Sequence, residues 1–107
     1  MAMVPTQMYT GQPGTTDTLL YTVPGGTTSL IKQITLTNTD TVTRTVTLGL
    51  NSGGALAAAN HLFSATPLVA KSVTVVDVSQ VLTTGQTVRA LQESATAVVV
   101  RISGVNF

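Results

Sequence analysis

The chain has 107 residues, which is enough for one small domain with a thin core. Only 8% of its residues are charged, against roughly 25% in an average soluble protein. The five basic residues are spread singly, so the sequence shows no basic cluster of the kind that nucleic-acid binding needs, although folding could still bring three of them together. The chain contains no cysteine, which excludes disulfides, thiol catalysis and cysteine metal ligation.

Alternation of apolar and β-branched residues with period two runs through almost the whole chain and predicts short, half-buried strands. Residues 6–10 are expected to form a first strand, which ends at the Gly-Gln-Pro-Gly turn of residues 11–14. A second strand is expected over 19–23, because the Pro-Gly-Gly sequence at 24–26 stops it. A third strand is expected over 29–38.

The third strand contains one break in its alternation. Leu30 and Ile31 are adjacent apolar residues, and a bulge near Lys32 would restore the pattern after them. The Asn-Thr-Asp-Thr sequence at 38–41 predicts a turn, since Asn and Asp side chains can bond the backbone two residues on. A fourth strand is expected over 44–50.

The second half of the chain continues the strand pattern. Residues 51–60 predict a loop of small residues in which the alanines could form one helical turn. Turns are expected at Pro67 and at 83–86. The remaining strands are expected over 61–64, 69–78, 81–82, 87–91 and 98–105.

The strand expected over 69–78 contains three candidate core residues, Val73, Val75 and Val76. Asp77 falls on the same face as Val75. If that face points inward, its carboxylate needs a basic partner such as Arg89 or Arg101.

About eight short strands, with turn signals at intervals of about 8 to 12 residues, predict an all-β fold built as an antiparallel β-sandwich. A jelly-roll-like and an immunoglobulin-like arrangement both fit, because the pattern does not give the strand order. Residues 1–18 are expected to form an N-terminal extended arm or a first strand. Residues 19–107 are expected to form a single sandwich domain.

The sequence contains few groups that could carry out chemistry. His61 is the only histidine, and neither a serine nucleophile elbow nor the further ligands that zinc needs accompany it. Asp17, Asp40 and Glu93 fall in predicted turns, where side-chain acceptors satisfy the backbone. We therefore predict that the protein is not an enzyme and that it has no metal site and no cofactor.

Threonine occupies most positions between the apolar residues from Ile34 to Leu50. A threonine fits the pleat of a strand, and its hydroxyl is wetted without carrying charge. Such a face can lie against water or against another subunit, because packing it buries no charge. An interface is therefore expected on a threonine face made of Thr35, Thr37, Thr43, Thr45 and Thr47.

Four segments carry a resemblance to a known family: LLYTVPGGTTSLIKQITLTNT at 19–39, VTLGL at 46–50, PLVAKSVTVVDVSQVLTTGQTVRA at 67–90 and VVVRISGV at 98–105. Together they resemble small virion proteins of tailed bacteriophages, over nearly the whole chain after about residue 6. The resemblance implies a β-sandwich that serves as a capsid decoration (cement) protein or as part of the neck, tail or fibres. It transfers no functional residue, because the shared positions are packing and turn positions.

These observations together predict a non-enzymatic structural virion protein. The leading hypothesis is that it decorates and stabilises a phage capsid by binding the lattice of the major capsid protein, as a homo-oligomer. The alternative is a tail, neck or fibre component with a role in recognition or adhesion. In both cases we expect synthesis in the host cytoplasm, location in the virion, virion structural proteins as partners, and neither nucleic acid nor membrane as a partner.

Overall fold

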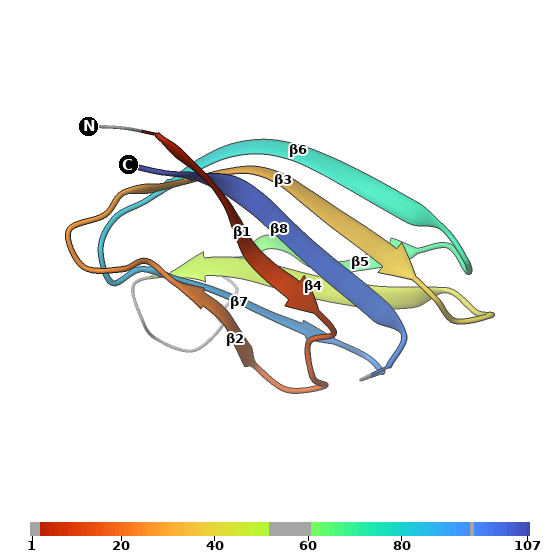
Figure 1. Ribbon diagram of the computed structural model, residues 1–107. Helices are drawn as coiled ribbons and strands as arrows, with labels where there is room; N and C mark the ends of the chain where they lie inside the picture. Colours follow the sequence, from red (N-terminus) through yellow and green to blue (C-terminus); the bar gives the residue numbers. More distant parts are fainter. Residues whose placement is uncertain (1–2, 52–60, 95) are drawn as a thin grey trace.

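The computed structural model describes residues 3–51, 61–94 and 96–107 (Figure 1). These residues form eight strands and contain no helix, so the all-β prediction is confirmed. In the same part of the chain there is accordingly no helix with the length and apolarity that crossing a membrane requires. The helical turn expected at the alanines lies outside the described residues. The strands are β1 (Val4–Gly11), β2 (Thr18–Thr22), β3 (Ser29–Asn38), β4 (Arg44–Asn51), β5 (His61–Leu68), β6 (Val73–Leu82), β7 (Thr87–Gln92) and β8 (Val98–Asn106).

The strands form two four-stranded antiparallel sheets that lie one above the other (Figure 1). Sheet A has the order β1-β8-β3-β6, and sheet B has the order β2-β7-β4-β5. Every connection passes from one sheet to the other except the β4–β5 connection, which stays within sheet B. This order is that of an eight-stranded jelly roll, so the structure selects the jelly-roll arrangement over the immunoglobulin-like one.

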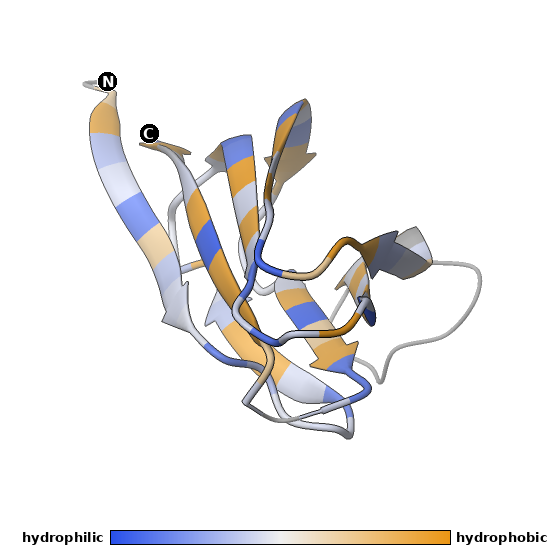
Figure 2. Cartoon of the chain, turned by 90° about the vertical axis from the view of Figure 1, so that its right-hand side faces the viewer, coloured by the Kyte–Doolittle hydropathy of each residue, from blue (hydrophilic) through white to orange (hydrophobic). Residues whose placement is uncertain are grey.

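One core fills the space between the sheets. Alternation along each strand turns one set of side chains inward, and Figure 2 shows the resulting bands of opposite hydropathy along the strands. Burying this set drives the two sheets together. The most buried members are Ile31, Ile34 and Leu36 of β3, Val46 and Leu48 of β4, Val88 and Ala90 of β7, and Val98, Val100 and Ile102 of β8.

The bulge expected near Lys32 is confirmed. The register of β3 shifts between Ile31 and Gln33 against both β6 and β8. Ile31 is fully buried, while the exposed Lys32 takes up the irregularity. The shift returns Ile34 to the core and leaves Leu30 on the outer face of the sheet.

Two of the expected core residues of β6 point outward. Val73 is 61% exposed and Val75 is 51% exposed, so their assignment to the core was wrong, while Val76 is half-buried and packs against the core. Asp77 shares the outer face with them and is exposed. The cause is that period two separates two faces without showing which of them another layer covers.

The first part of the chain belongs to the sandwich over residues 4–11. β1 pairs with β8 from Val4, opposite Asn106, to Gly11, opposite Val100. Residues 4–11 are therefore a strand at the edge of sheet A, and the two chain ends lie at the same end of the molecule (Figure 1).

A buried glutamine joins three parts of the chain where β7 passes into β8. Gln92 is 1% exposed. Its amide nitrogen donates to the carbonyl oxygens of Pro13 at 2.7 Å and Val98 at 3.0 Å, and its amide oxygen accepts the N–H of Val98 at 2.7 Å. The side chain therefore supplies hydrogen-bond partners to backbone groups of Pro13 and Val98 that are shielded from water.

Replacing Gln92 by leucine should lower the free energy of unfolding by about 2–4 kcal/mol, because the substitution leaves buried backbone groups without partners. Chemical denaturation measures this change. Gln7→Leu is the control, since Gln7 is exposed and its loss should change stability by less than about 0.5 kcal/mol. Similar losses in both variants would contradict a structural role for the buried amide.

Candidate interaction surface

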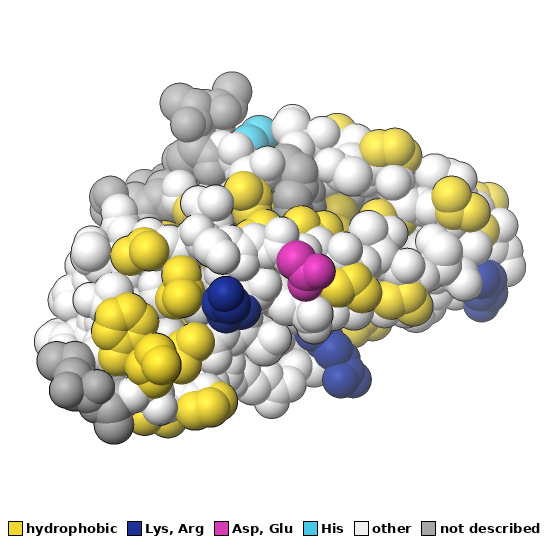
Figure 3. Space-filling view, turned by 90° about the horizontal axis from the view of Figure 1, so that it is seen from above, with side chains coloured by type: hydrophobic (Ala, Val, Ile, Leu, Met, Phe, Trp, Pro, Cys, Tyr) yellow, Lys and Arg dark blue, Asp and Glu magenta, His cyan; other side chains and the backbone are white. Residues whose placement is uncertain are grey.

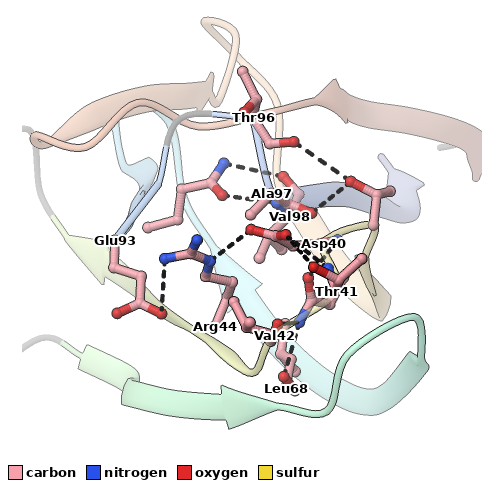
Figure 4. Close-up of polar contacts among 12 residues, drawn as sticks. Asp40, Thr41, Val42, Arg44, Leu68, Glu93, Thr96, Ala97 and Val98 are labelled. Carbon is pink, nitrogen blue, oxygen red and sulfur yellow. Dashed lines mark hydrogen bonds and ion pairs between the residues drawn. The ribbon is translucent and has the colours of Figure 1, made fainter.

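A cluster of charged side chains links the loop between β3 and β4 to Glu93, just after β7. Asp40 accepts the backbone N–H of Thr41 at 2.7 Å and pairs with Nε of Arg44 at 2.8 Å (Figure 4). Arg44 also lies 3.9 Å from Glu93, whose carboxylate accepts the N–H of Thr45 at 3.2 Å. The hydrogen bond from Thr41 and the neighbouring guanidinium of Arg44 lower the pKa of Asp40. Each carboxylate of this cluster therefore has a structural partner.

Acid should remove the contribution of Asp40 to stability. Because the folded-state pKa of Asp40 lies below its ordinary value of 3.8, the unfolded chain binds this proton more readily. The contribution is complete above that value and is lost as the pH falls toward the lowered pKa. Chemical denaturation at about pH 6 and about pH 3 should show a smaller acid loss in Asp40→Asn than in the natural chain. Asp77→Asn, outside the cluster, is the control, and identical acid losses in Asp40→Asn and the natural chain would contradict this assignment.

The remaining ionisable candidates do not converge. His61 is half-buried on β5, opposite Gly49 of β4. Among residues 3–51, 61–94 and 96–107, no three His, Asp or Glu side chains lie close enough together to hold a metal ion. Arg89 pairs with Asp17 at 3.3 Å. Asp77 does not pair with Arg89 or Arg101, as an inward carboxylate would have needed. It faces outward, and its carboxylate accepts the side-chain N–H of Gln33 at 3.2 Å.

The structure divides the five threonines of the expected interface between different parts of the molecule. Thr35 and Thr37 lie on β3 in sheet A, whereas Thr45 and Thr47 lie on β4 in sheet B, and Thr43 lies in the loop between these strands. Thr47 is 7% exposed, and its hydroxyl accepts the N–H of Ala65 at 2.8 Å. The five side chains therefore do not share one face.

The outer face of sheet A carries a different feature, a row of apolar side chains that crosses all four strands. Pairing of the strands places Pro5 beside Val105, Val105 beside Leu30, and Leu30 beside Val81. We call these four residues the apolar row. Figure 3 shows apolar side chains gathered on this face, at the end where both chain termini lie in Figure 1. Val81 is 61% exposed, and Met3, just before β1, is 68% exposed.

Unpaired charges lie on the same face as the apolar row. Lys32, Asp77 and Arg101 are all exposed, and none of them forms an ion pair with another described residue. An exposed apolar group rimmed by polar and charged side chains is the usual composition of a protein-binding surface. The arrangement can bind another protein surface by desolvating the row and pairing the charges at its margin.

Sequence reasoning missed the apolar row because its members are far apart in the chain. Only the strand register brings Pro5 and Val105 together, and no local pattern contains that information. One signal was present, since Leu30 is apolar at the position where β3 breaks its alternation. An apolar residue on the outward phase of a strand indicates a face that another molecule could cover.

No family model matches this chain, and no curated protein matches it. A crystal structure of a pentameric capsid protein isolated from metagenomic phage sequences is similar to it over 97% of this chain, with 16% sequence identity and a TM-score of 0.29. This chain spans 60% of the length of that protein. A TM-score of this size does not establish a shared architecture.

Proposed function

We propose that the protein is a non-enzymatic structural component of a tailed-phage virion, which decorates the capsid by binding the lattice of the major capsid protein through the outer face of sheet A. The observation that carries the proposal is the apolar row, in which Pro5 and Val81 are exposed and Leu30 and Val105 are half-buried on a face that no other layer covers. The resemblance of the strand segments to small phage virion proteins supports the choice of partner.

Burial of the apolar row would supply most of the binding free energy. Removing apolar surface from water contributes about 25 cal/mol for each Å², so full burial of one valine or leucine side chain contributes about 1.5–3 kcal/mol. The neighbouring Lys32, Asp77 and Arg101 present both signs of charge, which favours one orientation on the partner more than it raises affinity. A neutral, charge-poor surface around them keeps the desolvation cost of close packing low.

The direct test mixes the purified protein with undecorated capsids. We expect saturable binding and a higher temperature of capsid disruption, since a ligand that binds only the intact lattice stabilises it. Absence of saturable binding, or binding without a gain in heat stability, would contradict the proposal.

The surface itself is tested by Val105→Glu, which places a charge in the middle of the apolar row. The variant should bind capsids at least about tenfold more weakly, because the carboxylate would be desolvated on docking. Leu19→Glu is the matched control, since Leu19 is 49% exposed on β2 of the opposite sheet. Equal binding by the two folded variants would exclude the apolar row as the docking surface.

The alternative of a tail, neck or fibre component with a recognition role predicts a different copy number. A decoration protein occurs in hundreds of copies in each virion, whereas a neck or tail component occurs in about a dozen or fewer. Quantitative gel analysis of purified virions against the major capsid protein separates the two. A count near a dozen would favour the tail, neck or fibre component over the decoration protein.

A further inference from the structure

β6 presents a long free edge. It is the last strand in the order of sheet A, so its backbone pairs with β3 on one side only. It runs for 10 residues with unbroken alternation of exposed and more buried positions and contains neither proline nor glycine. Asp77 is its only charged residue. Long edges of this kind pair with other strands unless something prevents it.

The other three edges of the sandwich carry features that prevent strand addition. β1 contains Pro5, and its register shifts between Gln7 and Tyr9. β2 has only five residues, and its register also shifts. β5 contains Pro67 and Ala65, whose φ of 44° bends the strand. Proline and short length are usual protections of a sheet edge, and β6 is the one of the four edges that has neither, although its register against β3 also shifts, between Asp77 and Gln80.

We propose that two copies of this chain associate through β6, with the two strands antiparallel and centred on Val78. In this arrangement Val78 lies opposite the partner's Val78, and Val75 lies opposite the partner's Val81. Asp77 lies opposite the partner's Ser79. The two sheets A then form one continuous sheet of eight strands.

The residues of β6 select this register. A two-fold pairing centred on Asp77 would place the two carboxylates directly opposite each other, which is destabilising. A pairing centred on Val76 would place Asp77 opposite the partner's Val75, and one centred on Ser79 would place it opposite the partner's Val81. Centring on Val78 places the carboxylate opposite a hydroxyl and pairs two exposed valines on each side of the axis.

The symmetry of this pairing has a consequence for docking. Antiparallel strands that are neighbours in one sheet are related by a two-fold axis perpendicular to that sheet, so both outer faces point the same way. The dimer would present two copies of the apolar row on one side. This consequence rests on the proposed function, and it would raise the avidity for a repetitive lattice without any new contact. The dimer itself does not depend on the capsid.

The dimer is tested on the isolated protein by light scattering over a dilution series. We expect a molar mass that rises from one chain toward two with concentration. Val75→Glu should raise the dissociation constant at least about tenfold, because it places a carboxylate at the edge beside Asp77. Leu19→Glu, at a position of similar exposure on β2, should leave the dissociation constant unchanged. A single-chain mass at every concentration would overturn the proposal.

Cysteine variants test the register, because the natural chain has no cysteine. Val78→Cys should form a disulfide-linked dimer under mild oxidation, since directly opposed residues lie within disulfide reach. Val76→Cys is the matched control on the same strand and face, and its thiol would lie opposite Gln80 of the partner copy, far from the other thiol. Equal crosslinking of both variants would overturn the register. Capsid binding by a folded Val75→Glu monomer would separate failure of the dimer from failure of the proposed function.

Discussion

The rest of the structure depends on the one core between the sheets, to which Ile31 and Ile34 of sheet A and Val46 and Leu48 of sheet B belong. Every connection but one passes from sheet to sheet, so neither sheet is a continuous stretch of chain. Each strand therefore takes its place only when the other layer is present. A chain of 107 residues has enough apolar side chains for this one contact, and the outer faces of both sheets are left for water or for partners.

The distribution of charge follows from the same arrangement. Asp40, Arg44 and Glu93 hold the β3–β4 loop against the end of β7, and Asp17 holds Arg89 of sheet B. The charges on the outer face of sheet A have no such partners among the described residues. Apolar side chains are costly to leave in water, whereas the charges on this face are well hydrated and favour only a partner that pairs them, which is why we propose that sheet A is the binding face.

Much of the fold could be predicted from the sequence, because it depends on local patterns. Alternation with period two predicted most of the strands, and the adjacent Leu30 and Ile31 predicted the bulge at Lys32. The turn expected at Pro67 was wrong, because Pro67 lies inside β5, and the strands expected over 69–78 and 81–82 are one strand, β6. The strand order could not be predicted, since alternation says nothing about which strands become neighbours. Val73 and Val75 were wrongly assigned to the core because alternation does not show which face of a strand is covered, and they lie on the outward face of an edge strand.

The candidate site was less accessible to sequence reasoning than the fold. The threonines of β3 and β4 are close in sequence but belong to different sheets, so their shared pattern did not make a shared face. The apolar row has the opposite character, because its residues are distant in sequence and adjacent only through register. A surface built across strands becomes visible only when the pairing is known.

Electron cryo-microscopy of the intact virion tests the central claim most directly, because it locates the chain and shows which face touches its neighbour. Our account predicts density for the sandwich at regular positions on the capsid lattice, with the apolar row of sheet A buried against the major capsid protein. Density confined to the tail, or a sandwich seated on the capsid through sheet B with the apolar row in solvent, would contradict it.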